Sequence, residues 1–203
     1  MTNVRLYVEG GGDQKNTKQL LQNAIGAFLA NGLAQFGTKR RPKVIVWGAN
    51  LHTLALFSAA ISKHSQSVCV LLVDADGPVD CAPAEQLRRK HDWRKPQAVS
   101  DEQVHLMVQT MEAWIVADRE ALRDFYGPNL NEKQLSGRDD VEEIPTHELL
   151  EGLKRATRST RKGEYHKIRH ASILLQRINA GKAASRARHL KSLLEYLAKV
   201  LGS

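Results

Sequence analysis

Hydrophobic positions in the first half of the chain alternate between strand-like runs and helical spacing. Strand-like runs occupy residues 4–10, 43–48, 67–74 and 104–109. Apolar residues at helical spacing fill residues 13–31 and 51–64, and "AEQLRRKHDW" adds a short basic helix before the last strand. This strand and helix order predicts an α/β fold with a mainly parallel sheet flanked by helices on both faces.

Strand patterns stop after Gly127. Residues 128–145 are polar and turn-rich, so we expect a mobile loop or lid there. The remainder is helical, with Thr146 in the N-cap position of "THELLEGLKRAT". We therefore divide the chain into an α/β core (1–127) and a loop plus helical extension (128–203), packed on the core as one unit.

Composition is that of a folded, soluble protein. The chain has 203 residues, of which 42% are hydrophobic and 26% charged. It has no apolar run long enough to cross a membrane and no secretory signal, so we expect a cytoplasmic protein. Cys69 lies in an apolar run and Cys81 in a loop, which indicates two free thiols and no disulfide framework.

Positive charge is concentrated in the C-terminal quarter. Residues 151–203 hold 13 Lys and Arg against 3 Asp and Glu, whereas residues 1–150 hold 17 against 19. The predicted helical extension is therefore basic and would attract polyanions such as nucleic acid. Charge alone does not distinguish nucleic acid from a charged small molecule or an acidic partner protein.

Acidic residues stand where two predicted strands end. "VEGGGD" fails the dinucleotide-binding fingerprint because Glu9 would repel a phosphate unless a metal ion lay between them. "LLVDADGP" places Asp74 and Asp76 two positions apart, which in a continuous strand puts both carboxylates on one face. A parallel sheet would gather all three at one edge, where hard oxygen ligands suit Mg²⁺ or Mn²⁺.

Each of these residues also has a simpler explanation. An isolated strand-end acid such as Glu9 is commonly a cap or loop carboxylate, Asp13 fits the N-cap of the first helix, and Asp80 fits a turn. "DADG" also occurs in glycosyltransferases with a DxD pair and in aspartyl phosphotransferases. The prediction depends on the combination of Glu9 with the two aspartates.

Two further groups of residues extend the candidate site. Glu112 follows the fourth predicted strand and could reach the same edge, while Trp114 could pack beside it or stack on a base; Asp118 fits a cap of the next helix. Among the C-terminal cations we select Lys162, Lys167, Arg169 and His170 as substrate-binding candidates. Lys167 and His170 are neighbours on a helix and could clamp a phosphate, although a solvated basic face is the alternative.

The two acidic strand ends resemble a known fold. A strand ending in "VEG" and a later strand ending in "DAD" are similar to the Toprim fold of topoisomerases, primases and the overcoming-lysogenization-defect nucleases. More closely, "LYVEGGGD", "LLVDADGP", "MEAWIVAD" and "YHKIRHASILLQRI" resemble a Toprim-like bacterial family of unknown function, numbered 4276. The resemblance implies metal-dependent phosphodiester chemistry, with Glu9 as general acid or base and Asp74 and Asp76 as the metal-binding pair.

The chain is shorter than we expect for a topoisomerase or a complete primase. We therefore expect a Mg²⁺-dependent nuclease or a related phosphoryl-transfer enzyme that acts on nucleic acid. By analogy with the family, its setting would be bacterial defence or nucleic-acid processing, beside an ATPase partner protein. Two alternatives stay open: a non-catalytic module that binds nucleic acid or a partner through its basic helices, and nucleotide-sugar transfer by the aspartate pair.

Overall fold

A parallel sheet forms the centre of the molecule. The computed structural model describes residues 3–12, 14–48 and 50–202. Its four strands have the order β2-β1-β3-β4, and each neighbouring pair is parallel. The strands are β1 (Asn3–Glu9), β2 (Lys43–Trp47), β3 (Ser67–Asp74) and β4 (Val104–Met107). The predicted α/β fold with a parallel sheet is confirmed.

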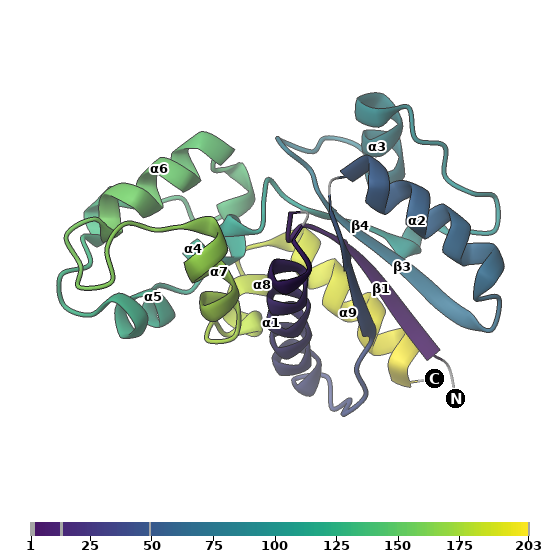
Figure 1. Ribbon diagram of the computed structural model, residues 1–203, viewed down its shortest axis with the longest axis horizontal. Coiled ribbons are helices and arrows are strands. Elements are labelled where there is room, and N and C mark those ends of the chain that lie inside the picture. Colours follow the sequence, from purple (N-terminus) through teal and green to yellow (C-terminus); the bar gives the residue numbers. More distant parts are fainter. Residues whose placement is uncertain (1–2, 13, 49, 203) are drawn as a thin grey trace.

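Helices cover both faces of this sheet (Figure 1). Val8 and its alternate neighbours along β1 belong to one hydrophobic cluster with α1 (Lys15–Ala34) and α9 (Arg188–Gly202). Tyr7 belongs to a second cluster with α2 (Asn50–Lys63) and α3 (Pro83–His91). Burial on both faces explains why β3 is a continuous apolar run instead of an alternating one.

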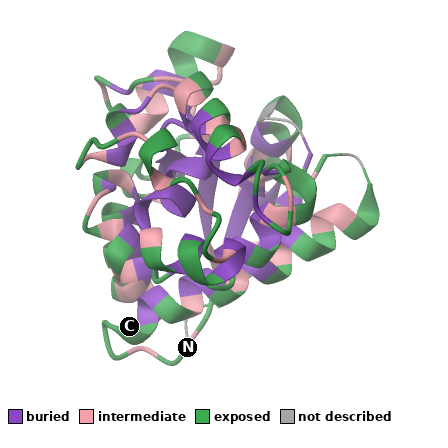
Figure 2. Ribbon diagram, turned by 90° about the vertical axis from the view of Figure 1, so that its left-hand side faces the viewer, coloured by how far each residue is buried: buried purple, intermediate pink, exposed green. Residues whose placement is uncertain are grey.

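The C-terminal helices share the core of the sheet domain. The helices α6 (Thr146–Thr157), α7 (Lys167–Leu175) and α8 (Ala180–Ala184) contribute buried residues, together with α9, to the cluster that contains Val8. Figure 2 shows buried positions on the strands and on the inward sides of the surrounding helices. The 128–203 region is therefore packed against the 1–127 region through one continuous apolar cluster.

Asp118 separates two short helices, α4 (Glu112–Ala117) and α5 (Arg119–Tyr126). Its Oδ1 accepts a hydrogen bond from the backbone N–H of Ala121 at 3.3 Å, which confirms the predicted cap. Its Oδ2 accepts from the backbone N–H of Asn179 at 2.8 Å. One buried carboxylate therefore caps α5 and holds the start of α8 beside it.

Residues 128–145 form a packed connection, whereas we expected a mobile loop or lid. They contain two 3₁₀ turns, η2 (Glu132–Gln134) and η3 (Val141–Glu143). The Arg186 guanidinium donates to the backbone oxygens of Arg138 at 2.6 Å and Asp139 at 2.9 Å. These long-range hydrogen bonds, which polar composition does not reveal, anchor the segment to the α8–α9 connection.

Two predicted helix caps have other outcomes. Thr146 is the first residue of α6 and Pro145 occupies the N-cap position, so the predicted Thr146 cap is wrong. Pro145 has a non-helical backbone (φ −57°, ψ 143°) and takes the N-cap position, so the helix begins at Thr146, one residue earlier than predicted. Asp13, the predicted cap of the first helix, lies outside the described residues.

Candidate functional site

The carboxyl ends of β1 and β3 bring two predicted site residues together. Glu9 ends β1 and Asp74 ends β3, and these strands are neighbours in the sheet. Glu9 Oε2 accepts a hydrogen bond from the backbone N–H of Asp74 at 3.1 Å. Both carboxylates therefore stand at the sheet edge where open α/β sheets bind ligands.

Asp76 lies just beyond the strand and not within it. Its backbone has a left-handed conformation (φ 51°), and its N–H donates to the carbonyl of Gln109 at 3.0 Å. Asp76 is exposed, whereas Asp74 is half-buried. The same-face geometry of a continuous strand therefore does not apply to this pair, because β3 ends at Asp74 and the chain turns after Ala75. The negative charge of Asp76 still acts on Asp74 and raises its pKa.

Glu112 is the fully buried member of the acidic cluster. It is the first residue of α4 and is fully buried, with 0% exposure. Its Oε1 accepts a hydrogen bond from the Tyr165 hydroxyl at 3.0 Å, and its Oε2 lies 3.6 Å from Lys167 Nζ. Among the described residues, Oε2 has no hydrogen-bond partner. Glu112 is therefore a buried carboxylate that pairs with Lys167 and is near enough to Asp74 to raise its pKa.

Burial and mutual repulsion leave Asp74 poorly suited to ionisation. The pKa of Asp74 is raised to about 8. Burial is the largest cause, the nearby Lys167 ammonium opposes it, and the carboxylates of Glu9, Glu112 and Asp76 add to it. Its Oδ1 is buried and has no hydrogen-bond partner among the described residues. A site with several carboxylates and one nearby lysine has an excess of negative charge, which a cation would stabilise.

Lys167 supplies the internal positive charge of this cluster. Burial lowers the pKa of Lys167, but the carboxylates of Glu112, Asp74 and Asp76 outweigh that effect, so the net shift is upward. Lys167 begins α7, and the N-cap His166 holds that turn by accepting from the backbone N–H of Ile168 at 3.2 Å. The side chain is more than half exposed, at 55%, so it can exchange carboxylate contacts for a ligand.

A cavity of about 700 Å³ opens over the acidic edge. Three segments form its walls: the glycine turn 10–12, the start of α1 with Thr17 and Leu20, and the start of α7 with Lys167 and Ile168. Glu9 and Asp74 are among the residues that line it. The glycine turn keeps one wall free of side chains, so a ligand can approach the backbone closely.

The remaining basic candidates do not line this cavity. Lys162 Nζ lies 4.8 Å from the centre of the Phe125 ring, and His170 Nδ1 is 2.9 Å from the Tyr126 hydroxyl. Burial lowers the pKa of His170. Arg169 is exposed on α7. Lys167 is thus the one of the four that lines the cavity, and the substrate roles of the other three stay predictions.

Trp114 belongs to the core. It has 0% exposure and stacks on Phe28 of α1, with ring centres 5.3 Å apart and an angle of 17° between the planes. Its burial is incompatible with base stacking, and its ring packs on Phe28. Packing beside Glu112 stays a prediction.

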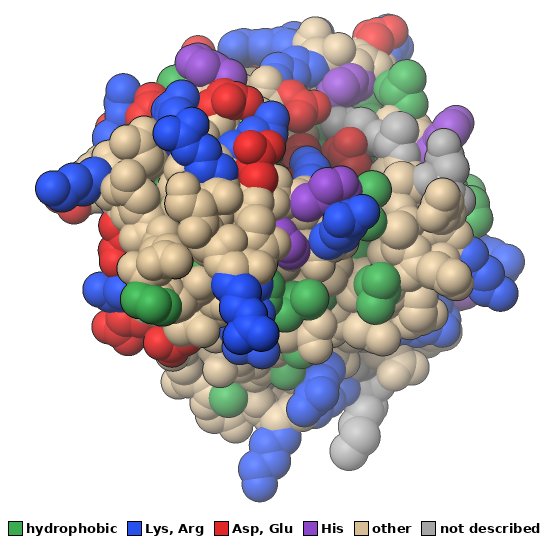
Figure 3. All heavy atoms as spheres, turned by 60° about the vertical axis from the view of Figure 1, so that its left-hand side comes forward, with side chains coloured by type: hydrophobic (Ala, Val, Ile, Leu, Met, Phe, Trp, Pro, Cys, Tyr) green, Lys and Arg blue, Asp and Glu red, His purple; other side chains and the backbone are tan. Residues whose placement is uncertain are grey.

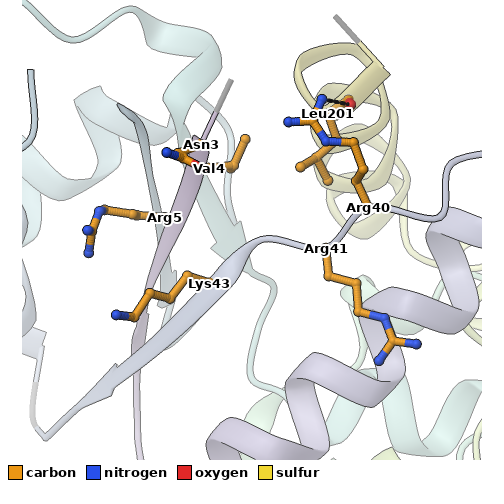
Figure 4. A pocket seen from close by; sticks show the side chains of 7 residues that line it. All are labelled: Asn3, Val4, Arg5, Arg40, Arg41, Lys43 and Leu201. Carbon is orange, nitrogen blue, oxygen red and sulfur yellow. Dashed lines mark hydrogen bonds between the residues drawn. The ribbon is translucent and has the colours of Figure 1, made fainter. Parts of the chain in front are cut away.

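A second cavity, of about 400 Å³, lies at the opposite edge of the sheet and is lined by four cationic side chains. In Figure 4, Arg5 and Lys43 extend to one side of the strands, whereas Arg40 and Arg41 lie on the other side. Arg40 donates to the carbonyl of Leu201 at 2.7 Å and so caps the end of α9. These cations diverge, and we assign them no common ligand.

Basic side chains are also dispersed elsewhere on the surface. On the face in Figure 3, Lys and Arg side chains are scattered with Asp and Glu side chains among them. The sequence excess of positive charge in residues 151–203 thus does not appear on this face as a single basic patch.

The donor set suits a hard divalent cation in chemistry and charge but is not preassembled around one. The cluster offers carboxylate oxygens from Glu9, Asp74, Asp76 and Glu112, and two of these oxygens are buried without a hydrogen-bond partner in the described part of the chain. Within residues 3–12, 14–48 and 50–202, no three metal-ligating side chains gather closely enough to hold an ion.

Tyr165 is the site residue with the weakest sequence signal. It lies within "YHKIRH", and its hydroxyl donates a hydrogen bond to the buried Glu112. A tyrosine outside any strand carries no pattern that predicts a carboxylate partner 53 positions away. Its place depends on the packing of α7 against α1 and α4.

The fold and site together define an α/β protein with an acidic cavity at the carboxyl edge of a parallel sheet. The chain belongs to the family described as Domain of unknown function (DUF4276), whose model matches residues 8–198. No curated protein and no solved structure matches the chain. None of the described helices is both long and apolar enough to span a membrane. The family description states no activity.

Proposed function

We propose that the protein is a Toprim-like, Mg²⁺- or Mn²⁺-dependent nuclease, or a related phosphoryl-transfer enzyme that acts on nucleic acid. The observation that supports this most directly is that Glu9 and Asp74 line one cavity, with Asp76 and Glu112 near enough to raise the pKa of Asp74. Asp74 Oδ1 and Glu112 Oε2 are buried and have no hydrogen-bond partner among the described residues. A bound divalent cation would neutralise charge on the non-bridging oxygens of a phosphodiester.

The chain's own residues would divide the remaining work. Asp74 and Asp76 would hold the cation, and Glu9, beside the Asp74 backbone, would accept the proton of the attacking water. Lys167 would leave Glu112 and contact a phosphate oxygen, because it is already charged and more than half exposed. Tyr165 would keep Glu112 in place through its hydrogen bond.

The test is isothermal titration of Mg²⁺ and Mn²⁺ into the wild type and an Asp74→Asn, Asp76→Asn double variant, followed by cleavage assays on labelled DNA and RNA. We expect metal binding and cleavage in the wild type and loss of both in the variant. A wild type that takes up neither metal, with or without nucleic acid, would contradict the nuclease proposal. An Asp80→Asn variant in the exposed loop after Asp76 is the matched control.

A non-catalytic binding module is the second candidate. It is favoured by the absence, within the described part of the chain, of three metal-ligating side chains at coordinating distance. Such a module would bind nucleic acid equally well with Asp76→Asn, and would lose affinity with Arg169→Ala on the exposed side of α7. An enzyme would show the reverse: lost turnover with Asp76→Asn and retained binding.

A further inference from the structure

The three tryptophans have different environments. Trp114 is fully buried, and Trp93 is half-buried, with its Nε1 donating to Ser58 Oγ at 3.3 Å. Trp47 is 45% exposed. A tryptophan ring is large and apolar, so leaving nearly half of it in water forfeits much of the stabilisation that burial gives. Such a ring is a candidate for contact with a ligand.

Trp47 stands beside the acidic cavity. It is the last residue of β2 and is in register with Glu9 on the adjacent strand. Neighbouring strands lie about 4.8 Å apart, so the Trp47 and Glu9 backbones are side by side. Gly48, the next residue, lines the cavity, and its carbonyl accepts from the backbone N–H of Gly10 at 3.0 Å. The ring is therefore attached to the rim of the cavity by a hydrogen-bonded turn.

A lysine accompanies this ring. Lys18 Nζ lies 5.2 Å from the centre of the Trp47 ring. Lys18 is in the first turn of α1, next to Thr17 in the cavity wall, and its backbone packs against Gly11 so closely that a Cβ there would lie 2.8 Å from Lys18 Cα. Trp47 is 45% exposed even with Lys18 over its ring. The ring therefore offers an accessible surface beside a positive charge.

An exposed aromatic ring and an adjacent cation are the two elements that proteins combine to bind single-stranded nucleic acid. The ring stacks on a base without reading its identity, and the cation contacts the phosphate backbone. Bases inside a duplex are stacked on one another and cannot reach the ring. Leu20 and Ile168, which are 53% and 59% exposed on the same rim, give an unpaired nucleotide further apolar contact.

We propose that Trp47 and Lys18 form a stacking platform for an unpaired base of single-stranded nucleic acid, with the neighbouring phosphate placed at the acidic cavity. This inference rests on the proposed function, because it takes nucleic acid as the substrate of that cavity. Its consequence is a preference for single strands over duplex.

The test measures the binding of a labelled oligonucleotide of about 12 nucleotides, single-stranded or annealed, at one fixed salt concentration. Trp47→Ala should weaken single-strand binding by about fivefold to a hundredfold, and Trp47→Phe should restore most of the loss. Duplex binding should change by less than about twofold. Phe36→Ala is the matched control, because Phe36 is 47% exposed but follows the far end of α1, about 30 Å away along the helix.

A spectroscopic measurement separates direct stacking from an indirect effect. Single strands should quench the tryptophan emission of the wild type, because Trp47 is the most exposed of the three tryptophans. The same titration of Trp47→Phe should leave the emission of the two remaining tryptophans unchanged. Emission that is quenched equally in both proteins would overturn the platform.

The outcomes separate this inference from the proposed function. If the wild type binds metal and cleaves nucleic acid but Trp47→Ala binds single strands as the wild type does, the platform is wrong and the nuclease proposal stands. If single strands bind through Trp47 but neither metal uptake nor cleavage is found, the platform stands and the nuclease proposal is wrong. If the wild type binds no nucleic acid, both are wrong.

Discussion

At the scale of single residues, Asp74 is a carboxyl group whose ionisation destabilises the folded state. Its pKa is raised from 3.8 to about 8, first by burial and then by Glu9, Glu112 and Asp76, against the opposing effect of Lys167. Between these two pKa values the folded state retains a proton that the unfolded chain has released. The free energy of unfolding therefore falls as the pH rises from about 4 to 8, by up to about 1.4 kcal/mol per pH unit.

We expect Asp74→Asn to remove this pH dependence. In chelator-treated protein, the unfolding temperature of the variant should exceed that of the wild type at pH 8.5, and the difference should shrink toward pH 5. Thermal unfolding at several pH values measures it, with Asp80→Asn, an exposed loop substitution, as the control. Parallel curves for the wild type and Asp74→Asn would show that the fold does not perturb this carboxyl. A carboxylate whose removal stabilises the fold is typical of a residue that is retained for function at the expense of stability.

At the scale of elements, the glycine turn after β1 sets the position of α1. Gly11 has φ +77°, and a Cβ added there would lie 2.8 Å from Lys18 Cα. Gly12 has a similar backbone, φ +58°, but nothing lies within 4 Å of an added Cβ. The two glycines therefore differ in packing but not in backbone preference, which makes them a matched pair.

We expect Gly11→Ala to lower the free energy of unfolding by clearly more than Gly12→Ala. The left-handed backbone alone costs roughly 1–2 kcal/mol for an L residue, and Gly11→Ala adds a clash with helix backbone that cannot rotate away. Urea denaturation measures both losses, and equal values would mean that the turn does not press on α1. Since α1 carries Thr17 and Leu20 into the cavity wall, Gly11→Ala should also weaken oligonucleotide binding.

The elements that the sequence predicts well are those whose signal is local. The apolar run of β3 and the helical spacing of α1 depend only on neighbouring residues, and the structure confirms them. The start of α6 and the anchoring of residues 128–145 depend on Pro145 and on Arg186, which is more than 40 positions from the carbonyls that it contacts. Periodicity contains no information about such partners.

At the scale of the whole molecule, the same distinction applies to the site. Parallel strand order predicts that Glu9 and Asp74 meet, because all strands end at one edge. It does not predict that Lys167 and Tyr165 reach Glu112, which lies more than 50 positions earlier in the chain. Those contacts depend on how α7 packs on α1 and α4. The sequence predicts that α7 is a helix and that it is basic, but it does not predict which element α7 packs against.

One apolar cluster joins the sheet to the C-terminal helices, so we expect the chain to unfold in a single transition. Leu197 of α9 has 0% exposure and belongs to the cluster that also contains Val8 of β1. Leu197→Ala should therefore destabilise the whole molecule by about 2–5 kcal/mol, and not α9 alone. Lys199→Ala on the same helix loses only an exposed ion pair with Glu102 and should cost less than about 1 kcal/mol.

Urea denaturation followed by far-ultraviolet circular dichroism and by tryptophan fluorescence should give coincident curves for the wild type, Leu197→Ala and Lys199→Ala. Curves that separate in Leu197→Ala would show instead that the helical region unfolds on its own, and that Lys167 can leave the acidic edge without loss of the sheet.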